Sequence, residues 1–85
     1  MSVNAEECDM EAFVLIQTAV GEAADVAQEL ASIDGVQSAM AVTGPYDVIA
    51  RIQGDNIDAL GKLVVSRVQL IAGVTRTLTC PIVRL

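Results

Sequence analysis

Two groups of residues in this chain have the types and spacing to recognise a small molecule. The first is the turn Thr43-Gly44-Pro45-Tyr46-Asp47. A glycine lets the backbone approach a ligand, a tyrosine offers an aromatic wall with a hydroxyl, and an aspartate can hold an ammonium group. On residue chemistry alone, a plain hairpin turn with proline at its second position is the simpler interpretation.

The second group is a set of threonines at alternate positions, Thr75, Thr77 and Thr79. Alternate residues of a strand point to the same face, so three hydroxyls would line one side of the last predicted strand. Threonines also fill edge strands without any ligand, because β-branched side chains suit the pleated sheet, and this is the simpler interpretation of the pattern.

The residues that most enzymes and metal sites need are scarce. The sequence has no histidine, no tryptophan and two cysteines, Cys8 and Cys80, which we expect to be reduced thiols. No serine has a histidine to activate it, and no glycine-rich phosphate loop is present. Two carboxylates close in sequence, Asp55 and Asp58, resemble a helix cap and a first-turn acid. We therefore predict no catalysis, no metal and no cofactor.

The composition predicts a protein that hides apolar surface in an interface. Its 85 residues are enough for one domain with a thin core, yet 53% of them are apolar and the mean hydropathy is +0.53. Apolar runs such as residues 13–16 fall far short of the ~20 residues of a membrane-spanning helix. We therefore expect a soluble, cytoplasmic protein whose excess apolar surface is covered by a partner subunit.

The net charge of −6 comes from 5 basic and 11 acidic residues. Four of the acids fall within residues 6–11, so residues 1–11 are interpreted as an acidic, flexible arm ahead of a domain over residues 12–85. The basic residues are scattered, whereas nucleic-acid binding depends on clustered positive charge. We therefore predict no direct contact with nucleic acid and none with a membrane.

The first half of the domain contains a strand, a helix and a strand. Residues 12–18 form a short apolar run with β-branched and aromatic members, which predicts a buried strand. Residues 22–32 place apolar side chains at i, i+3, i+4 spacing, which predicts an amphipathic helix that ends at Gly35. A second strand is predicted over residues 36–43, ahead of the turn.

The second half repeats this order after the turn. Residues 47–53 are predicted as a strand, and Asp55 as the N-cap of a helix that ends at Gly73. A last strand is predicted over residues 74–83, and Pro81 places it at a sheet edge because proline has no N–H to donate.

The two halves together predict an α+β fold of the ferredoxin-like βαββαβ type. Residues 33–36 and 71–74 share the pattern I-x-G-V at the end of each predicted helix. Two such units give a four-stranded antiparallel sheet of order 4-1-3-2 with both helices on one face. Both faces of the strands are largely apolar, so the bare face should pack on an identical sheet in a two-fold dimer.

This order of signals resembles the effector-binding domain of the Lrp/AsnC family, the RAM domain, named for regulation of amino acid metabolism. The resemblance covers about residues 12–83. It rests on a T-G-x-Y-D turn that leads into an apolar strand over residues 43–50, and on a G-V pair followed by a T-x-T strand over residues 73–79.

The resemblance implies a dimeric α-β barrel, further assembly into octamers, and amino-acid effectors bound at contacts between dimers. In this chain Gly44, Tyr46 and Asp47 would belong to the effector site, and Thr77 and Thr79 would complete it. Family regulators carry an N-terminal helix-turn-helix, whereas an acidic arm stands there in this sequence. The chain therefore resembles the stand-alone RAM members of the family. The resemblance does not imply that this chain binds DNA as the regulators do.

Three functions follow from these observations. The first is an amino-acid sensor that acts on transcription or amino-acid metabolism through assembly or by joining a full-length Lrp/AsnC-type regulator. The second is a structural or adaptor module that oligomerises without a ligand. The third is an enzyme similar to small monooxygenases of the dimeric α-β barrel type, against which the lack of histidine and tryptophan and the densely apolar strands argue.

Overall fold

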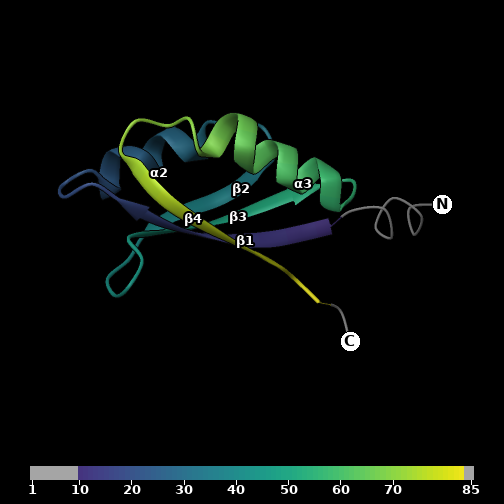
Figure 1. Cartoon of the computed structure of the whole chain (residues 1–85), viewed down its shortest axis with the longest axis horizontal. Helices are drawn as coiled ribbons and strands as arrows, with labels where there is room; N and C mark the ends of the chain where they lie inside the picture. Colours follow the sequence, from purple (N-terminus) through teal and green to yellow (C-terminus); the bar gives the residue numbers. More distant parts are fainter. Residues whose placement is uncertain (1–9, 84–85) are drawn as a thin grey trace.

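The computed structural model describes residues 10–83 and confirms the predicted βαββαβ order (Figure 1). The elements are β1 (Met10–Thr18), α2 (Ala23–Ala31), β2 (Val36–Ala41), β3 (Val48–Gly54), α3 (Ile57–Leu63), the π-helical turn η1 (Val64–Val68) and β4 (Val74–Pro81). Figure 1 shows both helices above one face of the sheet and the loop between β2 and β3 below it.

The sheet has the order β2-β3-β1-β4, which is the predicted order read from the other edge. All three pairings are antiparallel, so the ferredoxin-like α+β fold is confirmed. β4 pairs with β1 alone among the described strands, and Pro81 therefore lies on an edge strand as predicted.

The core lies between the sheet and the helices. Alternate residues of the two central strands point toward the helices because successive side chains of a strand point to opposite faces. All six of these residues are fully buried: Ala12, Val14, Ile16, Val48, Ala50 and Ile52. The helices contribute Val26, Leu30, Leu60, Val64 and Val68, and no polar side chain in residues 10–83 is buried.

The repeated I-x-G-V pattern makes the same turn in both halves. The N–H of Val36 donates to the carbonyl of Ile33 at 3.1 Å, and the N–H of Val74 donates to the carbonyl of Ile71 at 3.2 Å. The intervening glycine has a positive φ in each case, +96° and +98°, which favours glycine over residues with a Cβ. The helices themselves end earlier than these glycines, at Ala31 and Val68. Gly35 and Gly73 lie in the turns that return the chain to the sheet.

Several element boundaries differ from the prediction. β1 begins at Met10, two residues earlier than predicted and inside the stretch assigned to the acidic arm. Met10 packs against the core, and the carbonyl of Glu11 accepts from the N–H of Ile82 at 2.8 Å, so tertiary contacts extend the strand. β2 and β4 end two residues earlier than predicted, and β3 is shifted by one residue toward the C-terminus. The rest of the predicted arm, with Cys8, lies outside the described residues.

The N-cap of α3 is Asn56, and the prediction of Asp55 was wrong. The Asn56 side chain accepts a hydrogen bond from the N–H of Ala59 at 2.8 Å, and its backbone is extended, as an N-cap requires. Both residue types cap helices well, so the sequence alone did not separate these neighbours.

Replacing the cap should destabilise the domain by a predictable amount. Asn56→Ala removes the acceptor for the Ala59 N–H and should lower the free energy of unfolding by about 1 kcal/mol, measured by urea denaturation at one protein concentration. Asp55→Ala is the matched control and should change it by less than about 0.5 kcal/mol. A larger loss for Asp55→Ala than for Asn56→Ala would contradict the cap assignment.

Candidate functional site

The β2–β3 loop is fastened to the end of β1 through Asp47. One carboxylate oxygen of Asp47, Oδ2, accepts from the backbone N–H of Thr18 at 2.8 Å. The backbone N–H of Asp47 donates to the carbonyl of Ile16, and its carbonyl accepts from the N–H of Val42, both at 2.8 Å. The half-buried Asp47 therefore holds the loop in place, and its carboxylate still has lone pairs for a second partner.

The remaining predicted loop residues lie beside this anchor. Gly44 has φ +127°, and an added Cβ would meet nothing within 4 Å, so backbone conformation rather than space favours glycine there. The side-chain amide of Gln17 donates to the carbonyl of Pro45 at 3.0 Å, and Tyr46 is half-buried. Gly44, Tyr46 and Asp47 thus share one loop whose shape is fixed by contacts with β1.

The threonines of β4 lie on the helix side of the sheet. Thr77 and Thr79 stand opposite Ile16 and Val14 of β1, whose side chains are buried beneath the helices. The hydroxyl of Thr77 accepts from the side-chain amide of Gln69 at 3.0 Å. The hydroxyl of Thr75 instead donates to the carbonyl of Gln17 at 3.1 Å, next to a register shift, so Thr75 is used within the sheet.

Thr77 and Thr79 open on a groove between β4 and the α3–η1 helix. Its volume of about 380 Å³ falls within the range of small-ligand pockets. Nine described residues line it: Ile57, Leu60, Gly61, Val64, Val65, Gln69, Thr77, Thr79 and Pro81. None of the nine is charged. Gln69 and Val65 were not predicted as site residues, because nothing in the sequence distinguishes them from other exposed helix residues.

The loop residues and the threonines do not meet in one subunit. Thr77 pairs with Ile16, which pairs with Val48 at the start of β3, so about 10 Å of sheet separates the two groups. The strand register turns Thr77 and Thr79 toward the helices. The β2–β3 loop instead projects away from the helices (Figure 1). The groove that contains Thr77 and Thr79 has none of the predicted loop residues in its lining.

The sheet face opposite the helices carries an apolar row. In the ladder, Met40 pairs with Ile49, Ile49 with Leu15, and Leu15 with Leu78, so the row crosses all four strands. Met40 is 59% exposed and Leu78 is 47% exposed, and the neighbouring Phe13 is 40% exposed. Such a contiguous row on one subunit is typical of a surface that packs against another protein.

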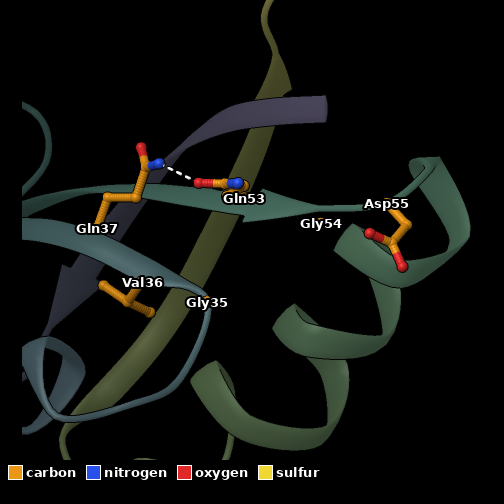
Figure 2. A pocket seen from close by; sticks show the side chains of 6 residues that line it. All are labelled: Gly35, Val36, Gln37, Gln53, Gly54 and Asp55. Atoms are coloured by element: carbon orange, nitrogen blue, oxygen red, sulfur yellow. Dashed lines mark hydrogen bonds between the residues drawn. The ribbon is translucent and has the colours of Figure 1, made fainter. Parts of the chain in front are cut away.

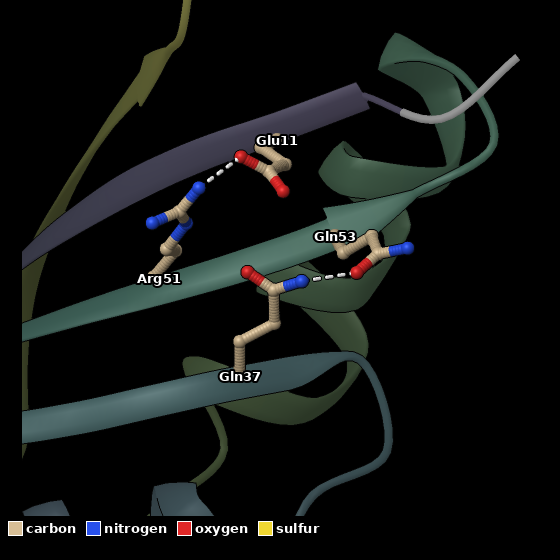
Figure 3. Close-up of polar contacts among 4 residues, drawn as sticks. All are labelled: Glu11, Gln37, Arg51 and Gln53. Atoms are coloured by element: carbon tan, nitrogen blue, oxygen red, sulfur yellow. Dashed lines mark hydrogen bonds and ion pairs between the residues drawn. The ribbon is translucent and has the colours of Figure 1, made fainter. Parts of the chain in front are cut away.

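A polar cluster lies beside this row on the same face (Figure 3). The guanidinium of Arg51 is 2.5 Å from a carboxylate oxygen of Glu11 and 5.9 Å from the centre of the Phe13 ring. The side-chain amide of Gln37 donates to that of Gln53. The cluster places a fixed pattern of charges and amides at one end of the apolar row, and the paired Gln17 and Arg76 stand at the other end of the same face.

A second hollow lies at the end of β2 and β3 away from the loop. It has a volume of about 350 Å³ and is lined by Gly35, Val36, Gln37, Gln53, Gly54 and Asp55 (Figure 2). The two lining segments are joined by a hydrogen bond from the N–H of Gln53 to the carbonyl of Gly35 at 2.8 Å. It contains none of the predicted site residues.

The described part of the chain offers no metal centre. Residues 10–83 contain no group of three or more histidine, cysteine, aspartate or glutamate side chains able to hold an ion, and Cys80 is a free, exposed thiol. No helix within this range is long and apolar enough to cross a membrane.

Comparison with known proteins gives a consistent result. The chain is 33% identical over 55 residues to an uncharacterised HTH-type transcriptional regulator of Pyrococcus furiosus, a match covering 65% of this chain and 37% of the regulator. The chain thus spans little more than a third of the curated relatives it matches.

Solved structures share the fold. A protein of Thermus thermophilus superposes with a TM-score of 0.83 at 29% identity, covering 89% of this chain and 95% of its own. A transcriptional regulator of Neisseria meningitidis, solved as a complex with L-methionine, has a TM-score of 0.82 at 17% identity, covering 99% of this chain and 56% of its own. The profile of the Lrp/AsnC ligand binding domain matches residues 11–84, nearly the whole sequence. This chain therefore belongs to the Lrp/AsnC ligand-binding domain family.

Proposed function

We propose that this domain binds a small effector, an amino acid, and couples that binding to the assembly of its subunits. Through assembly, or by joining a full-length regulator of its family, it modulates transcription or amino-acid metabolism in the cytoplasm. The observation that carries the proposal is the groove into which the hydroxyls of Thr77 and Thr79 open beside Gln69. The L-methionine complex of the Neisseria regulator supports an amino acid as the class of ligand.

The effector site is shared between subunits in this proposal. The loop with Gly44, Tyr46 and Asp47 would come from one subunit, and Thr77 and Thr79 from another. Within a single subunit the two groups lie too far apart to share a site. The carboxylate of Asp47 would hold the effector ammonium while it still accepts from Thr18. A ligand that touches both subunits stabilises their contact, so binding and assembly are coupled.

The first assembly step is a homodimer through the bare sheet face. Two such faces would pack with their apolar rows buried, as in a two-layer sheet sandwich. An identical sheet is the simplest partner, because a two-fold axis brings the same surface to both sides. Further contacts between dimers would then build an octamer and complete the effector sites.

A ligand-free adaptor is the second candidate function. It is favoured by the apolar row around Leu15 and Leu78, which would drive assembly whether or not the groove is filled. The two candidates differ in one respect, since only the sensor changes its stability when an amino acid is added.

The sensor predicts stabilisation by at least one amino acid. In a thermal-shift panel of the twenty amino acids at millimolar concentration, at least one should raise the melting temperature, since a ligand at about 100 times its Kd adds about 2.7 kcal/mol. Size-exclusion chromatography with the same ligand should show a changed distribution of oligomers. A flat response across the panel would leave the adaptor as the function.

The charge of Asp47 can be tested apart from its structural role. Asp47→Asn keeps an oxygen that can accept from the Thr18 N–H but removes the charge for an effector ammonium. Its melting temperature should stay close to that of the parent, whereas effector binding should fall at least tenfold, or about 1.4 kcal/mol. Asp47→Ala should lose both stability and binding. Unchanged affinity in Asp47→Asn would show that this carboxylate does not hold the effector.

The sheet-face dimer predicts a strong effect of a charge placed in the apolar row. Leu15→Lys would bury an unpaired ammonium between the two sheets and should raise the dimer dissociation constant at least 100-fold in sedimentation measurements. Val20→Lys is the control, because Val20 is fully exposed in the β1–α2 turn. If Leu15→Lys remains a dimer at micromolar concentration, the dimer uses a different surface.

A further inference from the structure

We infer that the groove between β4 and α3–η1 selects effectors with an uncharged, aliphatic side chain, such as leucine, isoleucine, valine or methionine. This inference rests on the proposed function and names the ligand class of the same site. It comes from the chemistry of the groove walls in this chain.

The walls of the groove are apolar along most of their length. Leu60 and Val64 form the floor, and Ile57, Val65 and Pro81 stand at the rim. Ile57 is 51% exposed and Val65 is 62% exposed, so two large apolar side chains face an open groove rather than the core. An aliphatic ligand would remove this surface from water, which is the main favourable term in binding such groups.

The polar residues of the groove are all neutral. Gln69 donates its amide to the hydroxyl of Thr77, which leaves the hydroxyl proton of Thr77 for another acceptor. Thr79 adds a second hydroxyl on the same side of β4. These groups can hydrogen-bond the polar end of an amino acid, but they provide no counter-ion for a charged side chain. A lysine or glutamate side chain would lose its hydration in the groove without compensation.

The helix that forms one wall is irregular at this place. The N–H of Gln69 donates to the carbonyl of Val64 at 2.8 Å, which is the i to i+5 bond of a π-helical turn. Such turns are rare and occur frequently at functional sites. This one supplies Val64 and Val65 to the apolar wall and is capped by Gln69, and its other buried residue, Val68, packs in the core. The irregular turn therefore joins the groove to the core.

A matched panel of ligands tests the selectivity. Isothermal titration of the full chain should give leucine, isoleucine or methionine at least tenfold tighter binding than lysine, glutamate and asparagine; asparagine controls for size without charge. If no amino acid binds, the proposed function itself is wrong. If lysine, glutamate or asparagine binds at least as tightly as every aliphatic amino acid, the effector function stands and the selectivity is wrong.

A pair of variants places the selectivity in this groove. Val65→Glu adds a carboxylate to the rim and should weaken leucine binding at least tenfold while weakening lysine binding less or strengthening it. Leu70→Glu is the control, because Leu70 is 76% exposed, lies just beyond η1 and does not line the groove. Its leucine affinity should equal that of the parent. Circular dichroism melting shows that each variant is folded before titration, and Val65→Leu should retain binding.

Two results would overturn the assignment of the groove. One is parental leucine affinity in a folded Val65→Glu variant. The other is an equal loss in Val65→Glu and Leu70→Glu, which would reflect charge on this side of the molecule rather than a change inside the groove.

Discussion

The constraint on which the rest of this structure depends is a sheet covered by helices on one face only. The central strands place six fully buried residues under the helices, yet the residues between them include Phe13, Leu15 and Ile49, which are also apolar. Residues 10–83 supply no third layer to cover them. The high apolar content is thus divided between a core inside the domain and an exposed sheet face. The proposed assembly rests on this face and does not depend on the ligand.

The same strand register creates the groove. Positions of β4 that stand opposite Val14 and Ile16 must face the helices, and in this chain they are threonines. β4 is the edge strand, so these inward positions lie at the margin of the helix layer, where Thr77 and Thr79 are only half-buried. Short side chains at the margin, beside a helix that changes to a π turn, leave space that larger residues would have filled. The proposed recognition site therefore lies at the margin of the core, where buried apolar residues such as Leu60 and Val64 form part of its lining.

Periodicity was sufficient to predict the elements, because it reports which residues are buried. The two helices, the four strands, their order and the edge position of β4 all follow from apolar spacing, glycines and Pro81. The errors occurred where tertiary packing or the exact local backbone geometry sets the structure. Met10 joins β1 because it packs on the core, Asn56 rather than Asp55 reaches the Ala59 N–H, and η1 leaves no mark in the sequence. For the candidate site, the sequence indicated the loop and the threonines, but the groove walls depend on how a helix and a distant strand pack.

The anchoring of Asp47 explains how one carboxylate can serve both structure and recognition. Its bond to the Thr18 N–H uses one oxygen and fixes the loop to the end of β1, together with the bond from the Asp47 N–H to Ile16. A loop held in this way is already ordered, so a ligand bound there spends little free energy on fixing it. Ile16 lies between Val48 and Thr77 in the sheet, so the loop anchor and the groove threonine are attached to the same residue of β1. The central strand therefore fixes the relative positions of the loop and the groove threonines. In the proposed assembly, subunits would meet with both groups already in place.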